Sequence, residues 1–162
     1  MPPSYNRFVA GFETIVTLDD ETVTAELGAR IAAMLRQGDV VALSGELGAG
    51  KTALARAILR ALGVTGHVPS PTFTLVQAYE TPGLLVHHFD LYRIEDEHEL
   101  HELGLDDAKE EGAVLIEWPD RGMPRAWQGD ALAVTLASVN ETARAAKIAG
   151  PVRWRSVAGG GS

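Results

Sequence analysis

Residues 40–52, VVALSGELGAGKT, decide the fold class of this 162-residue chain. The apolar run Val40–Leu43 predicts a strand that is buried on both faces. Gly45–Thr52 matches the phosphate-loop pattern G-x-x-x-x-G-K-[ST] (Walker A) without a mismatch, and chance would supply roughly 0.003 such matches in a chain of this composition. Glycines let backbone N–H groups turn inward around an anion. The stretch therefore predicts a nucleotide-binding loop rather than an ordinary glycine-rich turn.

The residue types in this loop predict their roles. A helix that starts near Lys51 directs its positive dipole end and its unpaired N–H groups at the phosphates. Lys51 can reach the β and γ phosphates, and Thr52 offers its hydroxyl to Mg²⁺.

Strands and helices alternate on both sides of the loop. Before it, Thr14–Leu18 predicts a short strand, and Asp19–Glu21 supplies the cap and first-turn acids of a helix that ends near Gln37. After the loop we expect a helix ending at Gly63, strands over 73–79, 84–92 and 113–116, a helix over 97–103, and a hairpin with strands over 131–139 and 143–149. This order predicts a P-loop NTPase-like, three-layer α/β fold with a central mixed sheet.

The length is that of one domain. We expect a single P-loop ATPase domain over residues 13–157, preceded by an irregular lead-in over residues 1–12. The glycine-rich end, residues 158–162, predicts a flexible tail, which is either an artificial addition or the start of a neighbouring domain.

Composition limits the class of protein. The chain is 46% hydrophobic and 22% charged, as in ordinary globular domains. It has no cysteine, which removes disulfide partners and thiolate metal sites. No apolar run approaches the roughly 18 residues of a membrane span, and the first residues lack a secretory signal, so we expect a cytoplasmic protein without membrane contact. The formal net charge of −8 argues against binding an RNA backbone alone, and the acidic stretch 95–111 is interpreted as a solvated face.

Two carboxylates at strand ends are candidates to complete a Mg²⁺ site and to handle water. Glu117 ends one apolar run and Asp90 ends another, and each pattern on its own is typical of a turn. Beside a phosphate loop, one division makes Glu117 a metal ligand and Asp90 the residue that orients or deprotonates the attacking water. The sequence also allows the reverse. Because no N-K-x-D element for guanine is present, ATP is favoured over GTP.

Further polar and aromatic residues lie near these candidates. Ser70–Thr74 is either a turn opening a strand or a segment whose hydroxyl, assigned to Thr74, senses the γ-phosphate. His87 and His88 alternate along a strand and should therefore face opposite sides of the sheet. Trp118 is either a core residue or an aromatic next to the nucleotide.

Four ordered sequence blocks resemble the TsaE (YjeE) family, the bacterial ATPase subunit for tRNA threonylcarbamoyladenosine synthesis. The blocks are residues 45–52, 70–76 (SPTFTLV), 88–93 (HFDLYR) and 116–119 (IEWP), and the similarity runs from about Asp19 to Pro119. The resemblance implies a small Mg²⁺-dependent ATP hydrolase that is weak alone. It would act with TsaD and TsaB, which transfer the threonylcarbamoyl group to tRNA adenosine 37, and would meet tRNA only through that complex.

The resemblance also implies site residues. Catalytic roles would belong to Asp90, Lys51 and, within the switch-like segment, Thr74. Thr52 and Glu117 would hold Mg²⁺. The nucleotide would be bound by Gly45, Gly48, Ala49, Gly50, Lys51, Thr52, Trp118, Glu21 near the adenine or ribose, and Arg144 as a candidate contact.

Two alternatives remain. A small-molecule or nucleotide kinase is compatible with the same loop, with Arg93, Arg121 and Arg125 binding a phosphorylated acceptor. The other alternative is an interaction module that binds nucleotide as a switch and whose acidic stretch docks a basic partner.

Overall fold

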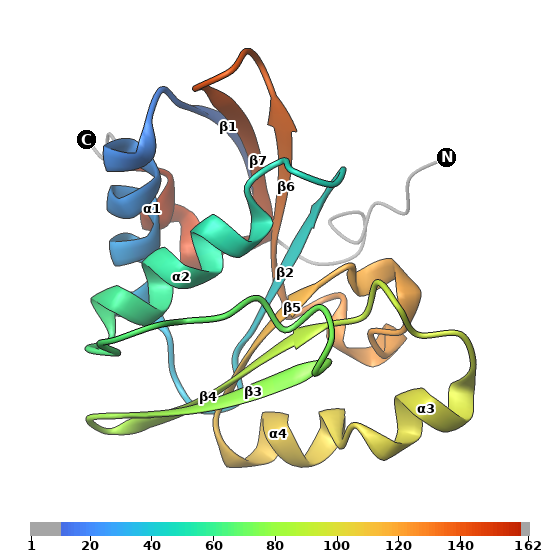
Figure 1. Cartoon of the computed structure of the whole chain (residues 1–162). Coiled ribbons are helices and arrows are strands. Elements are labelled where there is room, and N and C mark those ends of the chain that lie inside the picture. The colour runs from blue at the N-terminus through green and yellow to red at the C-terminus, as the bar shows by residue number, and fades with distance from the viewer. Residues whose placement is uncertain (1–10, 160–162) are drawn as a thin grey trace.

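The computed structural model describes residues 11–159, which form one mixed sheet with helices on both faces (Figure 1). The strands are β1 (Gly11–Leu18), β2 (Val40–Gly45), β3 (Val76–Thr81), β4 (Leu84–Asp90), β5 (Ala113–Glu117), β6 (Leu132–Ser138) and β7 (Arg144–Pro151). The helices are α1 (Glu21–Met34), α2 (Lys51–Ala61), α3 (Glu97–Glu102) and α4 (Leu105–Glu111). Three short 3-10 helices, η2 (Pro119–Arg121), η3 (Arg125–Trp127) and η4 (Val152–Ala158), complete the described part.

The seven strands lie in the order β1-β7-β6-β2-β5-β4-β3. The four central strands β6, β2, β5 and β4 are parallel, whereas β1 and β7 at one edge and β3 at the other pair antiparallel to their neighbours. The predicted mixed sheet and α/β class are confirmed.

The register of the parallel strands gathers the predicted site residues. Glu117 at the end of β5 is the register partner of Leu43 in β2 and of Asp90 at the end of β4. The phosphate loop follows β2 directly. Because the carboxyl ends of neighbouring parallel strands meet at one edge, this edge is where ligands bind in open α/β sheets.

The sheet separates two apolar cores. On one face α1, α2 and η4 pack over residues such as Leu43 and Leu115, and on the other α4 and η3 cover residues such as Ala42 and Ile116. The two helices of the first face approach closely because α1 carries Gly28, at which a Cβ would lie 2.6 Å from the Cβ of Ala57. This packing holds α2, and therefore the phosphate loop, against the sheet.

Some element boundaries differ from the sequence prediction. β1 begins at Gly11 rather than Thr14 because it pairs with β7 along its whole length. β3 begins at Val76 rather than Phe73, since the Leu75 N–H closes a turn on the Pro71 carbonyl at 2.7 Å. A second helix, α4, follows α3 after Gly104, whose positive φ of 73° breaks the first.

The predicted lead-in and tail lie mostly outside the described residues, so the division into lead-in, domain and tail stays a prediction. Among residues 11–159, no helix has the length and apolar character needed to cross a membrane.

Candidate nucleotide-binding site

The phosphate loop between β2 and α2 has the conformation that its glycines allow. Gly45, Gly48 and Gly50 have φ values of 141°, 79° and 106°, which L side chains rarely adopt. A Cβ on Gly45 would also lie 2.5 Å from the Leu136 carbonyl oxygen. The helix after the loop begins at Lys51, and its N-cap residue Gly50 makes no side-chain cap, so the first N–H groups of α2 are available to an anion.

Lys51 is almost completely buried at the mouth of this loop. Its Nζ donates to the carbonyl oxygens of Gly45 at 2.6 Å and Glu46 at 2.8 Å, and lies 4.4 Å from the ring centroid of Trp118. Burial lowers the pKa of Lys51 below the ordinary lysine value, and the nearby carboxylates of Glu117 and Asp90 partly oppose that shift. A phosphate entering the loop would therefore have to replace carbonyl partners that the ammonium already has.

Next to the lysine, the buried Glu117 and the half-buried Thr52 form a pair of oxygen ligands. The Thr52 hydroxyl lies 2.9 and 3.0 Å from the two carboxylate oxygens, and Glu117 is only 2% exposed. Hydroxyl and carboxylate oxygens are the ligands that Mg²⁺ prefers. Within residues 11–159, no group of three or more His, Cys, Asp or Glu side chains is placed to hold a metal ion. The pair fits a Mg²⁺ ion that takes its other ligands from phosphate and water.

Asp90 is buried beside Glu117 and is connected to the segment after α2. Its Oδ2 accepts from the Thr72 hydroxyl at 3.0 Å, and its Oδ1 accepts from the Tyr92 N–H at 2.9 Å. The Thr72 hydroxyl also lies 2.8 Å from that of Ser70. A chain of hydroxyl groups thus leads from the protein surface to this carboxylate.

Thr74, the hydroxyl favoured from sequence, lies elsewhere in the same segment. It is exposed, and its hydroxyl accepts from the Gln77 side-chain amide at 3.1 Å. The next residue, Leu75, has a φ of 69°, a conformation that costs a non-glycine residue about 1–3 kcal/mol and is enriched at functional segments. The role assigned to Thr74 stays a prediction, and Thr72 is the threonine of this segment that contacts Asp90.

A hollow of about 320 Å³ opens beside the loop. The start of α1 contributes Glu21, the loop contributes Gly50, and the β6–β7 hairpin contributes Arg144. The Arg144 guanidinium donates to the Gly48 carbonyl at 3.5 Å and to two hairpin carbonyls. The structure therefore brings Glu21 and Arg144 together at the phosphate loop, although they lie far apart in the sequence, at the start of α1 and the start of β7.

Two aromatic side chains, Trp118 and Tyr92, pack together next to Lys51 of the phosphate loop. Trp118 is half-buried with a φ of 58°, and its ring packs against Tyr92 at 4.7 Å between centroids. The Arg121 guanidinium lies over both rings. The Arg93 guanidinium stacks on the exposed Phe73 ring. Arg93 and Arg121 both line a further hollow, which is separate from the one that contains Arg144.

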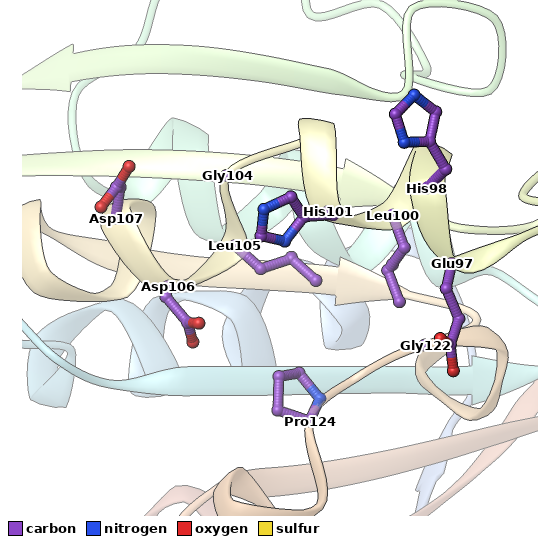
Figure 2. A pocket seen from close by; sticks show the side chains of 10 residues that line it. All are labelled: Glu97, His98, Leu100, His101, Gly104, Leu105, Asp106, Asp107, Gly122 and Pro124. Carbon is purple, nitrogen blue, oxygen red and sulfur yellow. The ribbon is translucent and has the colours of Figure 1, made fainter.

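A larger hollow of about 690 Å³ lies between α3, α4 and the loop around Gly122 (Figure 2). Figure 2 shows His98, His101 and three carboxylates on its walls, all on the far side of the sheet from α2. None of the sequence-predicted site residues lines it.

Sequence reasoning missed three features of the site. Thr72 lay inside the segment that was singled out, but nothing distinguished it from its neighbours. His88, whose Nε2 lies 2.7 Å from the Glu117 carboxylate, has no sequence signal that points to this contact, because it stands out only as one of two alternating histidines and as the first residue of the 88–93 block. The hairpin part of the hollow, with Leu136 and Thr142, carries no motif at all, so only the fold could reveal it.

Comparison with known proteins gives a consistent result. Residues 18–146 match the family model described as threonylcarbamoyl adenosine biosynthesis protein TsaE. That match continues past Pro119, where the sequence resemblance fades, and includes Arg144.

Individual relatives carry the name tRNA threonylcarbamoyladenosine biosynthesis protein TsaE. The chain is 40% identical to the Rickettsia typhi protein over 105 residues, which are 64% of this chain and 73% of that protein. It is 40% identical to the Haemophilus influenzae protein over 65% of this chain and 70% of that one, and 46% identical to the Bacillus subtilis protein over 54% of each. The crystal structure of Bacillus subtilis YdiB superposes with a TM-score of 0.72 at 24% identity, covering 91% of this chain and 92% of that one, and supports the fold.

Proposed function

The chain belongs to the TsaE family, and from this premise we propose that it is the Mg²⁺-dependent ATPase of the tRNA threonylcarbamoyladenosine pathway. The observation that carries the proposal is the meeting of four groups at one sheet edge. The phosphate loop, the Thr52–Glu117 pair, the Asp90 carboxylate and the hollow containing Arg144 come from separate parts of the chain and adjoin one another.

Each group has a role in binding ATP. The loop N–H groups and Lys51 hold the phosphates. Hydrogen bonds to a charged phosphate oxygen are roughly twice as strong as those between neutral groups. The hollow beside Gly50 holds the base or ribose, with Glu21 and Arg144 on its walls. Thr52 and Glu117 hold Mg²⁺, which would neutralise charge on the phosphates.

Asp90 acts on the attacking water. Its carboxylate is buried, so it is protected from competing solvent, and the Thr72 hydroxyl and Tyr92 N–H fix its direction. A carboxylate held in this way can orient a water molecule and accept its proton. Its two protein bonds leave further lone pairs for that water.

Partners complete the function. We propose that TsaD and TsaB bind this chain and that hydrolysis drives or resets their transferase complex in the cytoplasm, with tRNA reached only through the complex. The net charge of −8 supports the last point, because the chain alone would repel an RNA backbone.

Hydrolysis of ATP by the chain, alone and with purified TsaD–TsaB, tests the proposal. We expect slow turnover alone, stimulation by the pair, and loss of both in Lys51→Ala, with Lys109→Ala as the matched control from α4. Stoichiometric phosphorylation of a small molecule would instead favour the kinase alternative. Indifference to the pair by a chain that still binds ATP would contradict the partner assignment.

A further inference from the structure

His88 is a buried side chain that the proposed mechanism does not use. It lies on β4 two residues before Asp90, and it is completely excluded from solvent. Its Nε2 lies 2.7 Å from Oε2 of Glu117, whose carboxylate also receives the Thr52 hydroxyl. Resting on the proposed function, we infer that His88 is a positioning residue that sets the orientation of the Glu117 carboxylate for Mg²⁺.

The unpaired ring nitrogen identifies the donor. Among the described residues, Nδ1 of His88 has no hydrogen-bond partner, although it is buried. A proton placed on Nδ1 would be a buried donor without an acceptor, which is costly, whereas a proton on Nε2 is directed at a carboxylate oxygen. The imidazole N–H at Nε2 therefore donates to Glu117.

The hydrogen bonds to the Glu117 carboxylate come from two different elements, α2 and β4. Thr52, at the start of α2, reaches both carboxylate oxygens, and the His88 ring from β4 reaches Oε2 alone. If the Thr52 hydroxyl binds a cation, it can no longer be relied on to fix the Glu117 carboxylate, and the hydrogen bond from His88 is then the contact that keeps the carboxylate in place. Groups that orient a metal ligand in this way typically contribute 10- to 100-fold to metal affinity.

Packing alone does not account for a histidine here. The neighbouring buried position on the same face of β4 is Val86, and Leu115 of β5 is the register partner of His88. An apolar residue would fill such a site without leaving a buried nitrogen unpaired. The imidazole is therefore explained by the carboxylate that it contacts. The adjacent His87, whose ring stacks on Phe89, makes no hydrogen bond to Glu117 among the described residues.

The test measures metal-linked nucleotide binding, which needs no turnover. The affinity for ADP is measured by calorimetry in EDTA and over a range of MgCl₂ concentrations, for the wild type, His88→Leu, His88→Gln and the control His87→Leu. We expect His88→Leu to keep the metal-free ADP affinity within about twofold and to need 10- to 100-fold more Mg²⁺ for half of the metal-dependent gain. His88→Gln should recover most of this, because its amide N–H can replace that of Nε2.

Three results would overturn the inference. The first is an unchanged Mg²⁺ requirement in folded His88→Leu. The second is an equal loss of metal-free and metal-linked ADP affinity, which indicates a structural role. The third is a wild type that binds no ADP or shows no effect of Mg²⁺, which overturns the proposed function as well. If His88→Leu does not fold, His88→Asn, which is too short to reach Glu117, is compared with His88→Gln by the same criteria.

Discussion

Replacing Asp90 by asparagine separates hydrolysis from nucleotide binding. The substitution keeps the shape of the side chain, so its amide oxygen can still accept from the Tyr92 N–H while its amide N–H₂ donates to the Thr72 hydroxyl. Because both protein contacts can be made, we expect the free energy of unfolding to change by no more than about 1 kcal/mol. The lost property is the negative charge that would accept a proton from water.

The expected effect follows from that loss. A positioned general base contributes about 10²- to 10⁴-fold to a rate, which corresponds to roughly 3–5 kcal/mol of transition-state stabilisation. We therefore expect phosphate release in the presence of TsaD–TsaB to fall at least about 100-fold. ATP affinity, measured separately with a fluorescent analogue, should stay within about threefold, since Asp90 is not among the residues proposed to hold the nucleotide.

Three companion variants make the result decisive. Glu117→Gln should weaken the response of ATP binding to Mg²⁺. If Asp90→Asn hydrolyses ATP normally and Glu117→Gln does not, Glu117 would be the base and Asp90 the metal ligand. Thr72→Val should lower turnover about tenfold by releasing Asp90, whereas the sequence prediction places the larger effect in Thr74→Val. A larger loss in Thr74→Val would refute the reasoning from the observed hydrogen bonds.

Four further substitutions test other parts of the structure. Gly45→Ala should lower the free energy of unfolding by about 2–4 kcal/mol in urea titration because its Cβ would meet the Leu136 carbonyl in a strained backbone, whereas Gly48→Ala, which meets open space, should lose only about 1 kcal/mol. Arg144→Ala should weaken ATP binding about tenfold; unchanged affinity would remove the hollow from the nucleotide site. Burial raises the pKa of the Tyr79 hydroxyl, which has no partner among the described residues. Because the folded protein favours the neutral phenol, this group does not lower the free energy of unfolding below pH 10, and it lowers it progressively as the pH rises further. Tyr79→Phe should therefore be as stable as the wild type at pH 7 and should lose less stability at alkaline pH.

Much of the fold is predictable because the parallel strands carry strong local patterns. Val40–Leu43 and the run that ends at Glu117 are continuous apolar segments next to polar turn residues, which is typical of strands buried on both faces. The second acidic helix was not predictable, because α4 has only Leu105 and Ala108 to bury and so shows no clear apolar period. Pairing of β1 with β7 depends on contacts between the chain ends, which local patterns do not encode.

The site divides in the same way. The phosphate loop and the carboxylates Asp90 and Glu117 are predictable because each stands at the end of a strand or in a motif whose spacing is set by chemistry. Neither Thr72 nor His88 has such a signal, since which hydroxyl or imidazole reaches a carboxylate depends on the sheet register. Arg144 was placed only through the resemblance, and its position at the loop follows from the hairpin.

The position of β1 beside β7 has a consequence for how the chain folds. Gly11 pairs with Pro151, so the first strand of the sheet finds its partner near the other end of the described chain, and closing that contact is slow compared with local contacts. The half of the sheet that carries the phosphate loop is complete once β5 has been made, whereas β1 must wait until the β6–β7 hairpin offers a free edge. Glu21 follows β1 and Arg144 opens β7, so the walls of the hollow beside the loop assemble last. During synthesis, a growing chain would therefore acquire its phosphate loop before the hollow that we propose holds the base or ribose.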